Sequence, residues 1–179
     1  MERGFWQNKS VLVTGHTGFK GGWLSLWLHE LGAKVHGFSL EPIAEYEFYN
    51  RVYSDGFIGT EQFSDITDPN LIFKCVEKFQ PEIIFHLAAQ PLVRHSYNNP
   101  METYAINVMG VVNLLEAVRY SSAAPIIVNV TTDKVYVNNE WLWAYRETEP
   151  LGGIDPYSAS KACSEIITNS YMQSFFKGS

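Results

Sequence analysis

Near its start the chain carries the stretch Val11-Leu12-Val13-Thr14-Gly15-His16-Thr17-Gly18-Phe19-Lys20-Gly21, an apolar run that ends in three glycines spaced G-x-x-G-x-x-G. In a strand–turn–helix unit, such glycines let backbone N–H groups approach a pyrophosphate, and the helix dipole favours its charge. Glycine-rich turns also occur for purely structural reasons, but the strand and the helix that this fingerprint requires are both predicted here. We therefore expect a dinucleotide cradle at Gly15, Thr17, Gly18, Phe19 and Gly21.

Outside this stretch, apolar strands alternate with amphipathic helical segments. Strands are expected over 10–14, 34–38, 61–64, 83–88 and 126–131, and helices over 19–31, 69–79, 100–120 and 156–175. Gly32 stops the first helix, whereas Asn99-Pro100 and Asp155-Pro156 each pair a capping residue with proline at the first helical position. Residues 41–59 give no clear pattern. This order predicts an α/β fold, a Rossmann-type doubly wound parallel sheet in three α/β/α layers, with ligand at the carboxyl ends of the strands.

Length, charge, cysteine spacing and hydropathy further limit the class of protein to which the chain can belong. The 179 residues fit one domain, and the net charge of −6 argues against a nucleic-acid surface. Cys75 and Cys163 lack metal-ligand spacing, and neither they nor the histidines predict a metal site. The chain enters its first strand at once and has no apolar run that could cross a bilayer, so we expect no signal peptide, no membrane span and a cytoplasmic location.

Two groups of residues could carry chemistry. Tyr157 and Lys161 are four apart in a predicted helix and share a face. A phenol beside an ammonium is a good general base, because the positive charge favours phenolate. The plain alternative is a solvated tyrosine and a surface lysine, which a lone Tyr-x-x-x-Lys pattern would favour; the glycine turn upstream reverses that preference.

The second group is Thr132-Asp133-Lys134, which follows the fifth predicted strand. The carboxyl edge of a doubly wound sheet is where catalytic groups are presented, and this turn offers a hydrogen-bond donor, an acid and a base. An ordinary polar turn is the alternative interpretation.

Together these motifs resemble the extended short-chain dehydrogenase/reductase family, and within it the nucleotide-sugar 4,6-dehydratases, closest to the branch that acts on CDP-glucose. The resemblance covers nearly the whole chain. Lys134 is the sharpest marker of that branch, since dTDP-glucose relatives carry Glu there. The stretches that carry it are residues 14–21, Ala88-Ala89-Gln90-Pro91-Leu92-Val93-Arg94, Thr132-Asp133-Lys134, 152–157 and Tyr157-Ser158-Ala159-Ser160-Lys161.

The resemblance implies a set of catalytic roles. Tyr157 would take the proton from the sugar 4-hydroxyl while hydride leaves carbon 4 for NAD⁺, and Thr132 would hydrogen-bond that oxygen. Lys161 would hold the nicotinamide ribose and bias Tyr157 toward phenolate, and Tyr157 would contact the cofactor as well. Lys134 would help remove the proton at carbon 5, and Asp133 would protonate the departing 6-hydroxyl. Hydride then returns to carbon 6, so the cofactor is regenerated in each turnover.

The resemblance also implies cofactor and subunit contacts. Asp65-Ile66 match the pair that contacts adenine, Ala88, Ala89 and Gln90 belong to the cofactor site, and Asn107 matches a structural Asn of the long helix. The second strand ends in Ser39-Leu40-Glu41 without the usual Asp. Glu41 has the expected spacing of about 20 residues from the glycines, but it precedes Pro42, and an ordinary loop residue is the alternative. No Arg follows to receive a 2′-phosphate, so NAD is favoured over NADP. A homodimer through helices 100–120 and 156–175 is expected.

The length of the chain leaves alternative functions open. Family members are considerably longer, so we expect residues 1–179 to be the NAD(P)-binding Rossmann domain, the N-terminal part of a longer enzyme whose C-terminal substrate region is missing. The substrate is then a nucleotide sugar, with CDP-glucose favoured. Another nucleotide-sugar dehydratase, an epimerase, which would not need Asp133 and Lys134, or a non-catalytic NAD-binding module remain as alternatives.

Overall fold

The structure, a computed structural model, describes residues 3–42, 49 and 58–176. It contains a five-stranded sheet in the order β3-β2-β1-β4-β5, in which every neighbouring pair is parallel. The chain runs outward from β1 to β3 and then returns to the other side of β1, so the direction of winding reverses between β1 and β4. The strands are β1 Ser10–Thr14, β2 Lys34–Ser39, β3 Thr60–Phe63, β4 Ile83–His86 and β5 Ile126–Asn129.

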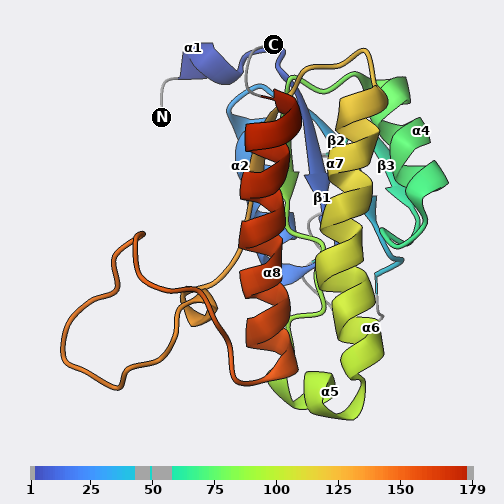
Figure 1. Cartoon of the computed structure of the whole chain (residues 1–179). Helices are drawn as coiled ribbons and strands as arrows, with labels where there is room; N and C mark the ends of the chain where they lie inside the picture. Colours follow the sequence, from blue (N-terminus) through green and yellow to red (C-terminus); the bar gives the residue numbers. More distant parts are fainter. Residues whose placement is uncertain (1–2, 43–48, 50–57, 177–179) are drawn as a thin grey trace.

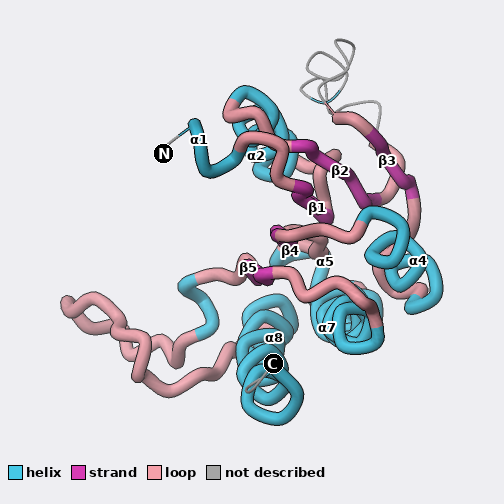
Figure 2. Tube along the Cα trace, turned by 90° about the horizontal axis from the view of Figure 1, so that it is seen from above, coloured by secondary structure: helices cyan, strands magenta, loops and turns pink. Residues whose placement is uncertain are grey.

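Helices cover both faces of this sheet (Figures 1 and 2). In Figure 2, α2 lies on one side, and α4, α7 and α8 lie on the other. The predicted three-layer Rossmann-type architecture is therefore confirmed. The helices are α1 Arg3–Trp6, α2 Phe19–Glu30, α4 Pro69–Phe79, α5 Val93–Asn98, α6 Pro100–Tyr104, α7 Gly110–Tyr120 and α8 Pro156–Tyr171.

The core consists of two apolar clusters, one on each side of the sheet. Leu12 and Ile84 pack with α4 and α7, whereas Val11, Val13 and Ile83 pack toward α2. Because a parallel sheet covered on both sides buries consecutive residues, its strands are apolar runs rather than alternating ones. Among the described residues, no helix has the length and apolar character of a membrane span.

The helix ends agree in part with the capping and stop residues that the sequence predicts. Asp155 caps α8, since its carboxylate accepts the Ser158 N–H at 2.9 Å and the Ser158 hydroxyl at 2.6 Å. Gly32, with φ +90°, follows the end of α2, the helix that it was predicted to stop. Asn99 does precede a helix that starts at Pro100, but its side chain makes no capping bond. Asn99 is therefore the N-cap and Pro100 the first residue of α6, as predicted, but Asn99 is also the C-cap of α5, which the sequence pattern did not reveal.

The helix expected over 100–120 is interrupted. A π-helical turn, Ala105–Met109, separates α6 from α7, and π turns inside α-helices are frequent at functional sites. The fourth and fifth strands end at His86 and Asn129, two residues earlier than expected at each, and so leave the following backbone free to line a cleft. Most of the stretch 41–59 lies outside the described residues.

A long segment between β5 and α8 leaves the body of the molecule (Figure 1). It begins with the short 3₁₀ helix η2, Asp133–Val135, and its base is closed by an antiparallel bridge between Tyr136 and Leu151. Tyr136 and Tyr145 stack with ring centroids 5.5 Å apart. The rest of this arm is mostly exposed, and it returns to the body at Gly152-Gly153, directly before α8.

Candidate active site

A cavity of about 540 Å³ opens at the carboxyl ends of the strands, where the winding reverses. This is the place where doubly wound sheets bind ligands. Eleven of the twelve residues expected to bind a cofactor line it: Gly15, Thr17, Gly18, Phe19, Gly21, Asp65, Ile66, Ala88, Ala89, Tyr157 and Lys161.

The glycine turn forms the tightest wall of this cavity. Gly15 adopts φ +74°, and a Cβ on it would lie 2.7 Å from the Ala88 nitrogen. A Cβ on Gly21 would lie 2.1 Å from the Gly15 carbonyl oxygen. Gly18 is the N-cap of α2 and has no side chain to satisfy the first N–H groups of that helix. Bare N–H groups at a helix N-terminus, reached over a turn without side chains, fit a pyrophosphate.

The end of β2 forms the rim. Ser39, Leu40 and Glu41 line the cavity, and the Thr17 hydroxyl lies 2.7 Å from the Ser39 hydroxyl and 3.2 Å from the Leu40 carbonyl oxygen. Glu41 lines the cavity just past the end of β2, the segment that carries the ribose-binding acidic residue in this fold. Lys20, in the first turn of α2, also lines the cavity; sequence reasoning missed it because it lies between two motif glycines and matches no pattern of its own.

Lys161 is buried rather than on the surface. The residue is 4% exposed, and its Nζ donates a hydrogen bond of 3.1 Å to the Val130 carbonyl oxygen. Burial lowers the pKa of Lys161 to about 8, helped by the charge of Lys20 and opposed by Glu165. A lysine removed from water and facing a cavity is a functional candidate, so the alternative of a solvated surface lysine is excluded.

Tyr157 lies half-buried at the same cavity. Its backbone N–H donates to the Ser96 hydroxyl at 3.2 Å. Burial raises the pKa of the phenol, the carboxylates of Asp155 and Asp133 raise it too, and a side-chain hydrogen bond with Thr132 opposes them. The expected bias of Tyr157 toward phenolate by Lys161 is not seen in this structure, because the Lys161 ammonium is directed to Val130.

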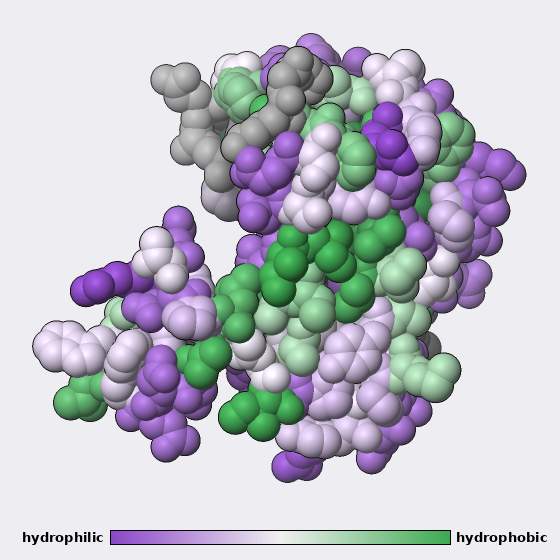
Figure 3. Space-filling view, in the orientation of Figure 1, coloured by the Kyte–Doolittle hydropathy of each residue, from purple (hydrophilic) through white to green (hydrophobic). Residues whose placement is uncertain are grey.

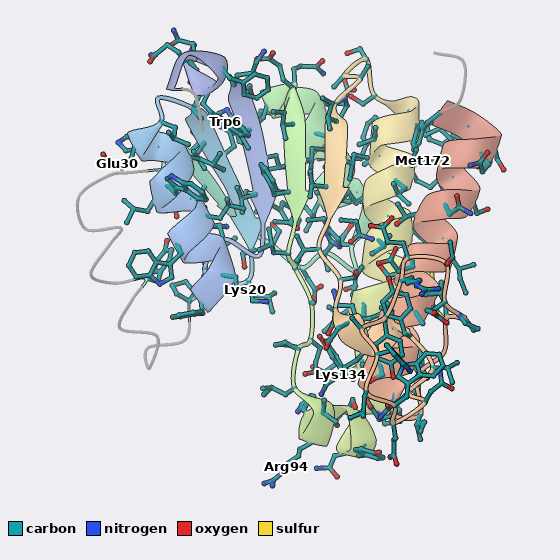
Figure 4. All side chains as sticks on the ribbon, turned by 90° about the vertical axis from the view of Figure 1, so that its left-hand side faces the viewer. Trp6, Lys20, Glu30, Arg94, Lys134 and Met172 are labelled. Carbon is teal, nitrogen blue, oxygen red and sulfur yellow. The ribbon has the colours of Figure 1, made fainter. Side chains whose placement is uncertain are left out.

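The turn that carries Thr132, Asp133 and Lys134 borders a neighbouring cavity of about 380 Å³. Asp133 and Lys134 line it, together with Asp155 and Ser158 at the start of α8. Thr132 lines neither cavity but contacts a residue of each: Tyr157 at the larger one, and Asp133, whose carboxylate accepts from the Thr132 hydroxyl at 3.1 Å, at the smaller one. In Figure 4, Lys20 and Lys134 both lie beyond the carboxyl ends of the strands, Lys134 on the side away from α2.

Gln90 differs from the other expected cofactor residues. It is buried outside the cavity lining, where its side chain donates to the Thr103 hydroxyl at 2.9 Å and accepts the Leu92 N–H at 2.6 Å. Asn107, in the π turn, accepts the Gln90 N–H at 2.8 Å and donates to the Ser160 hydroxyl at 2.9 Å. Both residues therefore fix the loop after β4 against α8.

No group of histidine, cysteine, aspartate and glutamate side chains in the described part of the chain could hold a metal ion. Cys75 is a buried core residue, and burial raises the pKa of its thiol to about 12. Its thiol is therefore protonated and unreactive at neutral pH.

The fold and the site together define a Rossmann-type protein of the extended short-chain dehydrogenase/reductase class. The family model described as GDP-mannose 4,6 dehydratase matches residues 12–176, and the chain belongs to that family.

Individual relatives agree with this placement. The chain is 49% identical over 176 residues to CDP-glucose 4,6-dehydratase of Salmonella typhimurium, covering 98% of this chain and 49% of that protein. It is 32% identical to UDP-glucuronate 4-epimerase 1 of Arabidopsis thaliana, covering 90% and 38%. Among solved structures, the complex of Thermus thermophilus UDP-glucose 4-epimerase with NAD superposes with a TM-score of 0.78 at 27% identity, covering 93% and 51%. The chain spans about half the length of the curated relatives it matches.

Proposed function

We propose that the chain supplies the NAD-binding domain and the catalytic side chains of a nucleotide-sugar 4,6-dehydratase that converts CDP-D-glucose to CDP-4-dehydro-6-deoxy-D-glucose. The observation that carries the proposal is the convergence of Tyr157, Thr132 and Asp133 between two cavities, one lined by the glycine turn and one by Lys134. The choice of CDP-glucose is supported by the 49% identity to the Salmonella enzyme. Residues 1–179 would form one domain of a longer enzyme, as their coverage of that relative suggests.

The cofactor proposed for the larger cavity is NAD. Its pyrophosphate would be held by backbone N–H groups in the first turn of α2, at Lys20 and Gly21, which it reaches over Gly15 and Gly18, and its adenosine end by Asp65 and Ile66. Glu41 supports NAD over NADP, because a carboxylate at the β2 end accepts hydrogen bonds from ribose hydroxyls and repels a 2′-phosphate. When bound, the cofactor accepts a hydride from the sugar and later gives it back.

The chain's own side chains would then move the protons. Tyr157 accepts the proton of the sugar 4-hydroxyl, and Thr132 holds that oxygen. The resulting 4-ketone acidifies the hydrogen at carbon 5, and Lys134 removes it. Asp133 protonates the 6-hydroxyl, which departs as water. Lys161 holds ribose hydroxyls, and its positive charge opposes protonation of Tyr157 once its ammonium leaves Val130.

Two competing functions are separated by specific features. An epimerase of the same class has no use for an acid and a base beside Tyr157, so Asp133 and Lys134 favour the dehydratase. A non-catalytic NAD-binding module would have no use for the acid and the base of Asp133 and Lys134, yet both line the cavity beside Tyr157.

The subunit and cellular context belong to the same proposal. Figure 3 shows hydrophobic side chains over α7 and α8. Large exposed side chains on these segments are Ile166 on α8, Tyr120 at the end of α7, and Met109 in the π turn before α7. This face supports a homodimer formed by these two helices. We also propose a cytoplasmic enzyme of deoxysugar biosynthesis, which suits a nucleotide-sugar substrate.

Incubation of the longer protein with CDP-glucose and NAD⁺ in D₂O tests the proposal. We expect a product that has lost one water and carries one solvent deuterium at carbon 5, without accumulation of NADH. A CDP-galactose product that retains the water would establish the epimerase instead. Binding of NAD⁺ without any conversion of CDP-glucose by the longer protein would favour the module.

A further inference from the structure

The buried ring of His86 has a hydrogen-bonding arrangement that fixes its tautomer. Its Nδ1 lies 2.7 Å from the Thr14 hydroxyl oxygen. That same oxygen accepts the backbone N–H groups of Leu87 and Ala88, each at 3.2 Å. A hydroxyl has two acceptor positions and one proton, so Thr14 donates its proton to Nδ1. Burial lowers the pKa of His86 to about 3, helped by the charge of Lys161, and the neutral ring therefore carries its proton on Nε2.

This Nε2–H group is a buried donor that has no hydrogen-bond partner in the part of the chain that the structure describes. The neighbouring residue on β5 has the opposite deficiency. Asn129 is in register with His86, and its Oδ1 is a buried acceptor without a partner among the described residues. Residues in register on parallel strands project to the same face of the sheet. His86 and Asn129 are thus neighbours that offer a complementary donor and acceptor. Leaving both atoms buried without hydrogen bonds would lower the stability of the fold.

The orientation of the Asn129 amide is also determined by its contacts. Its Nδ2 lies 2.8 Å from the Ser164 hydroxyl and 2.9 Å from the Thr168 hydroxyl. The Thr168 hydroxyl already donates its proton to the Ser164 carbonyl oxygen at 2.8 Å, so it can only accept from Asn129. The NH₂ group therefore faces α8, and Oδ1 is left for the side of His86.

These contacts reach the residues that face the cavity. Ser164 and Thr168 share a helical face with Lys161, three and seven residues further along α8. The Val130 N–H donates to the His86 carbonyl oxygen at 3.0 Å, and the Val130 carbonyl oxygen accepts from Lys161. At the other end, Thr14 directly precedes the glycine turn and holds the backbone of Ala88, which lines the cavity.

We propose that Thr14, His86 and Asn129 form a buried positioning chain, completed by one water between His86 Nε2–H and Asn129 Oδ1, that holds α8 in place against the glycine turn and thereby places Lys161 and Tyr157 at the cofactor cavity. This series of hydrogen-bonded side chains joins three walls of the cavity without lining it. His86 and Asn129 are positioning residues, not catalytic ones.

The first test does not depend on the proposed function. Long-range ¹H–¹⁵N NMR of the chain should show His86 as a single neutral Nε2–H tautomer from about pH 5 to 8, with magnetisation transfer from a bound water to that proton. An Nδ1–H tautomer, an ordinary titration of His86, or an Nε2–H without a water contact would overturn the proposal.

The second test follows the position of Lys161. His86→Phe removes both ring nitrogens, whereas His86→Gln retains an amide that can donate near the position of Nε2. We expect the pKa of Lys161, measured by NMR of its side chain, to rise toward the ordinary value in His86→Phe and in Asn129→Leu, and to stay low in His86→Gln. His36→Phe is the matched control, since His36 also contacts a threonine hydroxyl, Thr60 at 2.6 Å, but on the opposite half of the sheet. An unchanged Lys161 pKa in both His86→Phe and Asn129→Leu contradicts the positioning role.

The third readout rests on the proposed function. NAD⁺ should bind about tenfold more weakly to His86→Phe and Asn129→Leu, as expected for loss of one or two hydrogen bonds that order the site, and unchanged to His36→Phe. If the parent chain binds no NAD⁺, the proposed function fails, and the tautomer and the Lys161 titration still decide this inference. If the parent binds and neither variant weakens it, the inference fails alone.

Discussion

At the residue scale, Lys161 holds a charge where little water can reach it. Its lowered pKa means that between pH 8 and 10.5 the unfolded chain binds a proton that the folded chain has lost. The free energy of unfolding therefore rises with pH across this window, by up to about 3 kcal/mol from this group. The cost of burying Lys161 is largest below pH 8, where the folded chain keeps the charge, and vanishes above pH 10.5, where the group is neutral in the folded and the unfolded chain.

Comparison of the parent with Lys161→Met isolates that contribution, because all other titrations are common to both. We expect the variant to be the more stable one at pH 7 and this advantage to shrink as pH rises toward 10. Urea unfolding at several pH values measures the difference. A difference that does not change with pH would show that Lys161 is solvated.

Substitution of Asp133 and substitution of Tyr157 should affect different steps of the reaction. In the longer protein, Tyr157→Phe should lose both oxidation and loss of water, since elimination requires the 4-ketone. Asp133→Asn should still oxidise the sugar, while loss of water slows by about 10²–10⁴, the usual contribution of a general acid. Rapid-quench analysis of a single turnover distinguishes these outcomes. Equal slowing of both steps in Asp133→Asn would contradict the role assigned to its carboxylate.

At the scale of elements, the start of α8 depends on one cap. Asp155 satisfies the Ser158 N–H and hydroxyl, and its loss in Asp155→Ala should cost about 1 kcal/mol. Because Tyr157 is in the first turn, we also expect weaker NAD⁺ binding in this variant. Asp155→Ser can still cap and should restore both properties. Denaturant unfolding and a binding titration provide the readouts, and a loss of affinity that Asp155→Ser fails to restore would argue against the cap.

The sheet and most helices could be predicted because the signals are local. An apolar run, a glycine spacing and an Asp-Pro pair each report the conformation of their own residues. The π turn at Ala105–Met109 could not be predicted, since it depends on Asn107 bonding to Gln90 and Ser160 from distant segments. The same reason explains Gln90: its motif marked the loop correctly, but only tertiary contacts decide that its side chain serves the loop and not the cavity.

Within the site, the cavity lining was largely predictable and the electrostatics were not. Motif spacing brings Gly15, Ala88 and Lys161 to one edge of the sheet. The direction in which an ammonium points, and hence whether Lys161 acts on Tyr157 or on Val130, depends on side-chain placement that no spacing encodes. His86 was missed for a similar reason, because its surroundings come from other strands.

At the scale of the whole molecule, the exposed apolar face of α7 and α8 should associate. We expect a dimer at micromolar concentration by light scattering. Ile166→Lys, at a position 56% exposed on α8, should shift it toward monomer, whereas Trp27→Lys, at a position 52% exposed on the opposite layer, should not. A parent that remains monomeric at high concentration contradicts the proposed interface.

The central claim is that this fold binds NAD⁺ at the glycine turn between β1 and α2. Gly18 is the position to substitute, because its φ of −77° is open to any residue. A Cβ there would lie 3.3 Å from the Gly15 carbonyl oxygen, a tight contact that requires this oxygen to move by a few tenths of an ångström. Circular dichroism establishes that Gly18→Val is folded, with a branched side chain placed where the pyrophosphate must approach. The decisive measurement is a calorimetric titration of NAD⁺ into the purified chain and into this variant. The account predicts binding of one NAD⁺ per chain and at least tenfold weaker binding by folded Gly18→Val; equal affinity in both, or no binding to the parent, would contradict it.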